Sequence, residues 1–324
     1  MLLSVILPVR NGKDYIYDAV DSVLKQTYND FELIIINDGS TDSTLQILKS
    51  FNDNRIKIIT TEGIGLVNAL NLAIDESSGT YIARMDADDI CFNNRFEEQM
   101  KVLKNSNIGV VCADVKLIDE DGNVIGFSKD FYKNKNDLMN MLTFKEKRKP
   151  IIHPTAIINK KILHKIGGYR HFSSAEDRDL WLRLSNECEF YRIQKYLLKY
   201  RINSQGISKT KYFEQKVSSM LTVVCYEVEK KIGFDIYKNK ELFLNTTYLL
   251  HNEIEKIKLQ YETFENFKEK VKNKSKIDKI NILLMQYNFI QILFHYFFEL
   301  KTSRKLIEKI VKITIFEIRK KGLV

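Results

Sequence analysis

Cysteine, proline and tryptophan are scarce in this chain of 324 residues, which contains four, three and one of them. The cysteines lie far apart, and no two have the short spacing typical of metal ligands. We therefore expect reduced thiols in a cytoplasmic protein and not an extracellular disulfide framework. The few prolines, among many Lys, Asn and Ile residues, favour helices in the less patterned regions.

Targeting signals and a dinucleotide-binding glycine motif are also missing. The opening stretch MLLSVILPV has no basic leader or cleavage site, so we expect neither a signal peptide nor a membrane span there. The glycines at 63 and 65 do not continue to G-x-G-x-x-G, which argues against a dinucleotide-binding oxidoreductase.

The net charge of +9 is concentrated in the last third of the chain. Residues 1–206 carry 28 basic and 28 acidic side chains, whereas residues 207–324 carry 23 and 14. This division suggests chemistry in the first part and attachment in the second. Lysines on solvated helix faces would explain the same counts, and we keep both interpretations.

Strand and helix patterns alternate over the first 115 residues. A continuous apolar run, typical of a buried parallel strand, occurs at 4–9, and further strand patterns follow at 31–38, 55–60, 81–85 and 109–119. Helical patterns lie between them at 14–26, 65–76 and 95–104, and Ser40, Thr41 and Asp42 are N-cap candidates before a further one at 45–51. This alternation predicts a doubly wound α/β sheet with right-handed crossovers.

Polar segments follow three of the predicted strands, at Pro8–Asn11, Asn37–Ser40 and Asp86–Asp89. In such sheets, ligands bind beyond the carboxyl ends of the strands. The third segment crowds three carboxylates into four positions, where they repel one another unless a cation lies between them. Asp-x-Asp at a strand end suits Mg²⁺ or Mn²⁺ with a phosphate completing the shell. A turn whose acids cap the next helix is the alternative.

The pattern loosens after residue 120. Residues 153–170 have the pattern of a strand, a helix and a Gly-Gly turn, and residues 174–186 that of a loop entering a helix. From about residue 212 to the end, the chain has the pattern of consecutive helices.

Several motifs, in order and at suitable spacing, resemble those of the family 2 glycosyltransferases, which have the GT-A fold. They are LPVRN, VLKQTY, FELIIINDGSTD, RMDADD and SAEDRDLWLRL. The resemblance covers roughly residues 1–206 and implies a GT-A type mixed sheet there. Its nucleotide-sugar half would be about 1–118 and its acceptor half about 119–206, followed by a helical, basic region at 207–324.

The resemblance implies roles for residues on the nucleotide side. Pro8 and Asn11 would line the nucleotide pocket, and Asp38 would accept the ring N–H of a uracil. Asn37 stands where many relatives have a second Asp. Gly63–Asn71 would form a wall of the donor pocket, although a plain helix start explains it equally well.

Metal and phosphate contacts are implied for a second group. Asp88 would ligate the metal directly, and Asp86 would lie by the ribose or by a metal-bound water. Arg84 would orient this loop beside the nucleotide. Tyr200-Arg201 resembles a late loop that folds over the diphosphate, for which Arg is suited.

The catalytic base is expected in the Glu-Asp motif. An acceptor hydroxyl must lose its proton as it attacks the anomeric carbon, which requires a general base. The resemblance implies Asp177 as this base and Glu176 as its neighbour or orienter. The alternative is that both acids only favour the start of a helix. His153 resembles a residue of the acceptor-side segment.

Two interpretations remain for residues 277–324. Residues 277–298 are apolar but too often interrupted by polar residues for a clean membrane span. Residues 301–324 combine an apolar side with 8 basic side chains, which suits a helix on an anionic lipid surface. An ordinary helix that packs on its own domain, or on the partner of a homodimer, fits equally.

We therefore predict an inverting, metal-assisted glycosyltransferase. It would move a sugar from a nucleoside diphosphate sugar, a uridine diphosphate sugar in our interpretation, to a hydroxyl of a glycan or lipid-linked acceptor in cell-surface polysaccharide synthesis. We expect it in the cytoplasm, with residues 277–324 as the candidate contact to the inner face of the cell membrane.

Two alternatives remain beside this prediction. A nucleotidyltransferase would need a Gly-rich basic loop after the first strand, which LPVRNGKDY lacks. A non-catalytic nucleotide- or membrane-binding protein is the other. Nucleic acid is not expected as a partner, because basic and aromatic residues form no recognisable module.

Overall fold

The computed structural model describes residues 3–104, 108–128, 132–144, 151–172, 174–203, 212–253 and 304–324. The chain divides into two compact units. Unit 1 comprises Met1–Met139, Arg148–Phe172 and Glu176–Thr210, and unit 2 comprises Asn140–Lys147, Ser173–Ala175 and Lys211–Val324.

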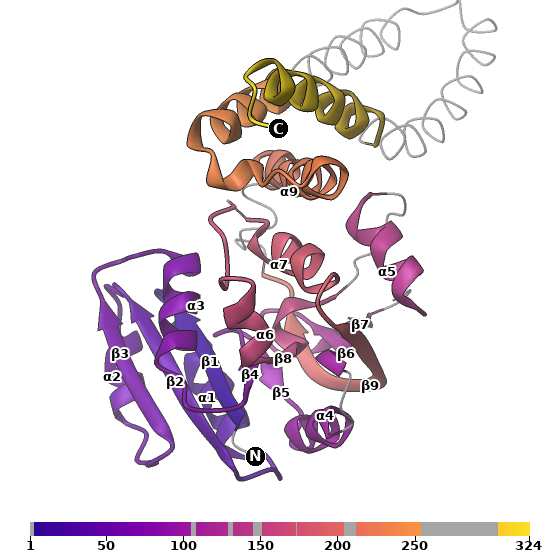
Figure 1. The fold of residues 1–324 in the computed structure, drawn as a ribbon. Helices are drawn as coiled ribbons and strands as arrows, with labels where there is room; N and C mark the ends of the chain where they lie inside the picture. Colours follow the sequence, from indigo (N-terminus) through magenta and orange to yellow (C-terminus); the bar gives the residue numbers. More distant parts are fainter. Residues whose placement is uncertain are drawn as a thin grey trace, which may run out of the picture. The chain divides into compact units, whose positions relative to one another are not determined.

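A mixed sheet forms the centre of unit 1 (Figure 1). Its strands are β1 (Leu3–Val9), β2 (Phe31–Asp38), β3 (Ile56–Thr61), β4 (Tyr81–Arg84), β5 (Ile90–Cys91), β6 (Ile108–Ile118), β7 (Val124–Phe127), β8 (Ile157–Asn159) and β9 (Glu189–Arg201). Within the described residues their order is β3-β2-β1-β4-β8-β6-β9-β5, with β7 paired to β6. Strands β1 to β4 run parallel, whereas β8 is antiparallel to both β4 and β6.

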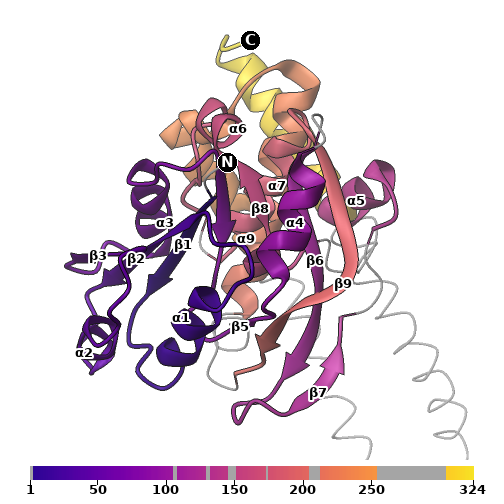
Figure 2. The ribbon, with the colours of Figure 1, turned by 90° about the horizontal axis from the view of Figure 1, so that it is seen from below.

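Helices cover both faces of this sheet (Figures 1 and 2). They are α1 (Ile16–Leu24), α2 (Thr44–Lys49), α3 (Leu66–Asp75), α4 (Arg95–Leu103), α5 (Lys135–Leu142), α6 (Lys160–Lys165) and α7 (Glu176–Leu184), with a 3₁₀ turn η1 (His153–Thr155). The main core joins α1, α2 and α4 to one face, whereas α3, α6 and α7 lie on the other. Because both faces are covered, β1 is apolar at nearly every position and fully buried.

The predicted fold class is confirmed: the sheet is mixed, and helices flank it. One long strand was not predicted. β9 has 13 residues and pairs in parallel with β6, and the short β5 pairs with β9. The prediction of a loop at Tyr200-Arg201 is wrong, because both residues end β9. All four cysteines are free.

Unit 2 is helical. It contains α9 (Tyr212–Ile232), the 3₁₀ turn η2 (Ile236–Lys238) and helices at residues 240–253 and 304–320. Two ion pairs tie the last helix to the others, Arg304 with Glu227 at 2.8 Å and Lys309 with Glu253 at 2.7 Å, and Lys321, just after this helix, pairs with Glu241 at 2.7 Å.

The apolar side of the last helix is largely covered by its own unit. Leu306, Ile307, Ile310 and Ile318 are buried, and Ile313 is half-buried. For residues 304–320 the structure therefore supports the packing alternative over a lipid-facing stripe. Residues 277–298 lie outside the described part of the chain.

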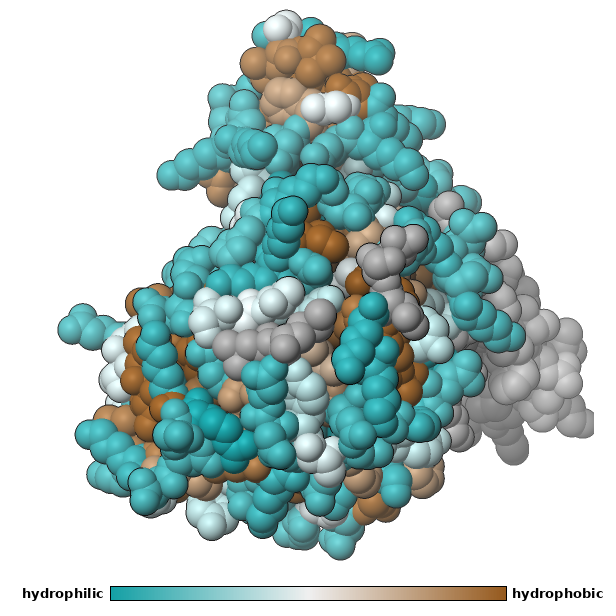
Figure 3. Space-filling view, turned by 60° about the horizontal axis from the view of Figure 1, so that its bottom comes forward, coloured by the Kyte–Doolittle hydropathy of each residue, from teal (hydrophilic) through white to brown (hydrophobic). Residues whose placement is uncertain are grey.

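No described helix combines the length and apolar character needed to cross a bilayer. On the face of the molecule seen in Figure 3, hydrophobic residues form separate areas divided by hydrophilic ones.

Candidate active site

The loops that follow β1 and β2 are joined by Asn11. Its backbone has a left-handed φ of 55°, a conformation that Asn tolerates better than most residues. Its N–H donates to Ser40 Oγ at 2.9 Å, and its Oδ1 accepts the N–H of Thr41 at 2.8 Å. Pro8 lies buried in β1, opposite Ile36 of β2. Asn11 and Pro8 thus shape the two loops at the carboxyl edge.

Asp38, at the end of β2, organises the start of α3. Its Oδ1 accepts the Thr61 hydroxyl at 2.7 Å and the Ile64 N–H at 2.6 Å, and its Oδ2 accepts the Gly65 N–H at 2.9 Å. A carboxylate has about four lone-pair sites. These three bonds therefore leave room on Oδ2 for one more donor.

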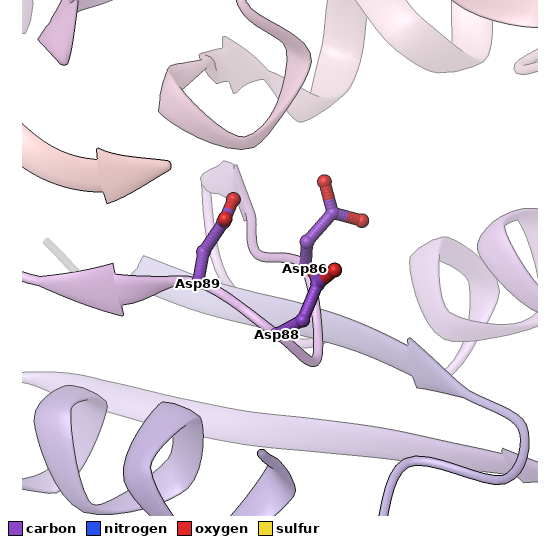
Figure 4. A group of neighbouring side chains, drawn as sticks. All are labelled: Asp86, Asp88 and Asp89. Carbon is purple, nitrogen blue, oxygen red and sulfur yellow. The ribbon is translucent and has the colours of Figure 1, made fainter. Parts of the chain in front are cut away.

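Three acidic side chains cluster after β4 (Figure 4). Ligand oxygens of Asp86, Asp88 and Asp89 lie within 4.8 Å of one another. Burial, then repulsion by Asp86, raises the pKa of Asp88 to about 6. The same causes, with the charge of Asp88 added, raise the pKa of the buried Asp89 well above its usual value.

Two arginines, Arg84 and Arg201, bind residues of this cluster. Arg84 is 3% exposed, and its Nη1 lies 2.6 Å from Asp86 Oδ1 in an ion pair. Arg201 uses its guanidinium for three backbone carbonyls, those of Asp88 at 2.8 Å, Asp119 at 2.8 Å and Glu120 at 2.7 Å. The backbone N–H of Arg201 also donates to Asp89 Oδ1 at 2.8 Å. Arg201 therefore holds the acidic loop through the backbone.

The acidic cluster fits a hard divalent cation. Its donors are carboxylate oxygens, and the elevated pKa values record a repulsion that a cation would remove. Asp89 Oδ2 is buried and has no hydrogen-bond partner among the described residues. Asp86 and Asp88, which are both half-buried, are the more accessible ligands.

A second acidic pair starts α7. Glu176 is 8% exposed, and Asp177 is half-buried with its Oδ1 accepting the Arg178 N–H at 2.6 Å. Burial, then the charge of Asp177, raises the pKa of Glu176 to about 7. Glu176 is therefore partly protonated near neutral pH, beside the half-buried Asp177.

The two acidic groups act on the same tyrosines. The pKa of Tyr200 is raised by burial and by the charges of Asp86, Asp88, Asp89 and Asp177. The pKa of Tyr169 is also raised, mainly by burial, and among its neighbours Glu176, Asp177 and Asp86 raise it whereas Arg84 lowers it. Residues about 90 positions apart in the chain thus lie near the same two tyrosines.

His153 lies beside this site, in η1. Its Nε2 is 2.7 Å from Tyr169 Oη, and its ring meets the edge of Trp181 with centroids 5.7 Å apart. Burial, and next the charge of Arg84, lowers the pKa of His153 well below its usual value. The imidazole is therefore neutral at physiological pH.

Sequence reasoning missed the residues that hold the turn at Gly167–Tyr169. The side chain of Asn71, in α3, donates to the Tyr169 carbonyl at 2.9 Å and accepts the Tyr169 N–H at 2.8 Å. Gly168 has a φ of +66°, and a Cβ there would lie 2.6 Å from Asn71 Oδ1. The Gly-Gly pair signalled this turn, but nothing signalled its partner 98 residues away.

Arg183 holds the same turn from α7. It donates to the carbonyls of Ile166 at 2.8 Å and Gly168 at 2.7 Å. A buried ion pair with Asp179, 2.7 Å long, fixes the guanidinium. The turn that carries Tyr169 is therefore fastened to α3 on one side and α7 on the other.

Comparison with protein families finds one match over half of the chain. The model of "Glycosyl transferase family 2" matches residues 4–167. An O-antigen biosynthesis glycosyltransferase of Escherichia coli, WbnJ, is 38% identical over 215 residues, which are 64% of this chain and 83% of that protein. An uncharacterized glycosyltransferase of Haemophilus influenzae is 30% identical over 96% of this chain and 97% of its own length.

Solved structures share the fold at low sequence identity. Residues 1–349 of S. aureus TarS, in complex with UDP-GlcNAc, align with a TM-score of 0.59 and 19% identity over 78% of this chain and 72% of that one. This chain covers 43% of the longer TarS chain. A mannosyltransferase of Pyrobaculum calidifontis, in complex with GDP-Man and Mn²⁺, aligns with a TM-score of 0.55 and 16% identity over 97% and 87% of the two chains.

Proposed function

The chain belongs to glycosyl transferase family 2 and is a glycosyltransferase, and from that premise we propose that it transfers a sugar with inversion from a UDP-sugar to a hydroxyl of a glycan or lipid-linked acceptor. Family membership sets aside the nucleotidyltransferase and the non-catalytic binding protein. The similarity to an O-antigen biosynthesis enzyme supports a role in surface-polysaccharide assembly.

The observation that carries the proposal is the meeting of two acidic groups at one site. The cluster after β4 offers oxygen ligands, and the pair at the start of α7 offers a base. Tyr169 and Tyr200 respond to charges from both groups. A leaving group bound at the first and a hydroxyl activated at the second would lie on opposite sides of a sugar.

Donor binding falls to residues at the carboxyl edge of the sheet. The remaining lone pair on Asp38 Oδ2 suits the ring N–H of uracil, and Asn11 and Pro8 shape the loops around the base. Asp86 and Asp88 would hold Mg²⁺ or Mn²⁺, which supplies Lewis acidity for the charge that develops on the diphosphate. Arg84 and Arg201 keep these ligands in place.

Proton transfer falls to Asp177. It is half-buried, so an acceptor hydroxyl can reach it, and it stands in the first turn of α7. A protonated Glu176 beside it can donate a hydrogen bond without adding a second negative charge. One base and one in-line displacement invert the anomeric carbon.

The division of labour along the chain is part of the proposal. Residues 1–118 would hold the donor, residues 119–206 the acceptor, and the basic region of residues 207–324 would serve attachment.

The test is a screen of UDP-sugars for UDP release with Mn²⁺, first with water as acceptor. We expect turnover with one of them, and Asp177→Asn should lower it at least about 100-fold while keeping the affinity for UDP. Asp75→Asn, an exposed acid at the end of α3, is the matched control. Normal turnover of Asp177→Asn would remove the base from this position.

A further inference from the structure

The proton on the Tyr169 hydroxyl has one acceptor within the described part of the chain, His153 Nε2 at 2.7 Å. Tyr169 is 4% exposed, so a phenol without this bond would be a buried donor with no partner. If Nε2 donated instead, the buried phenol proton would have no acceptor among the described residues, so we take Nε2 as the acceptor. With Nε2 accepting, the imidazole proton lies on Nδ1.

The Nδ1–H of His153 is then left as a donor. No described residue accepts a hydrogen bond from it, although the ring is held on two sides by Tyr169 and Trp181. A ring fixed so firmly, with one polar atom to spare, resembles a ligand-binding group more than a core residue. Arg84, whose charge contributes to the lowered pKa of this ring, pairs with Asp86 and so joins the ring to the acidic cluster.

Neighbouring groups indicate the ligand. Trp181 lies one helical turn after Asp177 on α7, so the side of the helix that contacts His153 also carries the proposed base. Asp86 and Glu176 both act on Tyr169. The group between a diphosphate site and a general base is the sugar itself, whose hydroxyls accept hydrogen bonds.

We propose that Tyr169 is a positioning residue that holds His153 in the Nδ1–H tautomer, and that Nδ1 donates a hydrogen bond to a hydroxyl of the transferred sugar. Asn71 and Arg183 fix the turn from which Tyr169 reaches the ring. The donor-side helix α3 and the acceptor-side helix α7 thereby set one polar contact together. The sugar contact rests on the proposed function, whereas the tautomer does not.

Nitrogen-15 spectra of histidine-labelled protein test the tautomer. His153, identified by its loss in His153→Gln, should be neutral at pH 7 with the proton on Nδ1. Tyr169→Phe removes only the hydroxyl and should move this proton to Nε2 or divide it between the two nitrogens. Tyr191→Phe, at a tyrosine that is 46% exposed, should change nothing. A wild-type Nε2–H tautomer, or the same spectrum in Tyr169→Phe, would overturn the proposal.

Donor hydrolysis tests the sugar contact, with UDP-glucose and UDP-N-acetylglucosamine as probes. Tyr169→Phe should lower kcat about tenfold, the loss of roughly one hydrogen bond in the transition state, with the affinity for UDP unchanged. His153→Asn places an amide N–H near the position of Nδ1 and should retain more activity than His153→Gln. Equal activity of these two variants, or a normal kcat in Tyr169→Phe, would refute the contact.

The two arms separate this proposal from the proposed function. If wild-type protein releases UDP from neither probe nor any other UDP-sugar of the screen, then the proposed donor is contradicted, and the spectra still decide the tautomer. If it hydrolyses one probe and the spectra show Nε2–H, then the function stands and the role of Tyr169 does not.

Discussion

Asp88→Asn should stabilise the protein in the absence of metal. In an unfolded chain the pKa of an Asp is near 3.8, whereas in the folded protein burial and Asp86 raise that of Asp88 to about 6. An acid with a raised folded pKa is destabilising above that pKa, because the unfolded state then releases its proton more easily. Asn keeps the size of the side chain and removes the charge.

The size of the effect follows from the shift. About two pKa units correspond to about 3 kcal/mol at pH 7.5, and to about half of that at pH 5, where the folded carboxyl is largely protonated. At pH 4 about 0.5 kcal/mol should remain, and near pH 3, below both pKa values, the difference should vanish. Urea unfolding in EDTA at these pH values measures it, with Asp75→Asn as the control that should change stability by less than about 0.5 kcal/mol.

Two results would refute this reasoning. If Asp88→Asn is less stable than wild type at pH 7.5 in EDTA, then the carboxylate serves the fold, as a cap or hydrogen-bond acceptor. If the gain is the same at pH 4 and pH 7.5, then charge repulsion is not its source. The first outcome would return the cluster to the helix-capping alternative, and the second would attribute the gain to packing instead of charge.

Three further predictions concern the turn and the metal. Gly168→Ala should lower the free energy of unfolding by about 2 kcal/mol or more, because its Cβ would clash with Asn71 in addition to the strain of a positive φ. Gly167→Ala has the same strain but its Cβ would meet nothing within 4 Å, so it should cost only about 1 kcal/mol in urea unfolding. Equal losses would argue against the clash with Asn71. Arg183→Lys should lower the free energy of unfolding by about 2 to 4 kcal/mol, because lysine cannot bind Asp179 and both carbonyls at once. Arg10→Lys, at an exposed arginine, is the control and should leave stability unchanged. Unchanged stability in Arg183→Lys would contradict its role in the turn. The Mn²⁺ affinity measured by calorimetry should increase by up to about tenfold for each unit that the pH is raised toward 6, and should level off above pH 6, because Asp88 must lose its proton to bind the metal. An affinity that does not change with pH would exclude Asp88 as a ligand.

The first half of the fold was predictable because strands that are buried on both faces are apolar at consecutive positions in the sequence. β1 and β2 are continuous apolar runs, which only a covered parallel strand requires. β9 has no such run. It pairs with β6 through shifts in register, Ile193 opposite Ala113 but Tyr196 opposite Asp114, so its buried residues do not alternate. Residues 189–201 therefore lack the period of two by which a strand is recognised.

The site divides in the same way. Short contiguous motifs contain the acids Asp86, Asp88, Glu176 and Asp177, so these candidates could be identified from the sequence. The contact of Asn71 with Tyr169 spans 98 residues and involves an ordinary amide side chain. Arg201 was assigned to phosphate from its type, whereas the structure commits its guanidinium to three carbonyls. Tertiary packing decides which hydrogen-bond partners a polar group has. This information is not contained in a single sequence.

Titration calorimetry of UDP with and without Mn²⁺, on wild type and Asp88→Ala, tests most directly whether the acids at the sheet edge hold a cation that binds the donor diphosphate. We expect Mn²⁺ to tighten UDP binding by at least about tenfold in wild type and to have no effect on Asp88→Ala. UDP binding that is equally tight with EDTA, or an equal response to Mn²⁺ in the variant, would contradict the account.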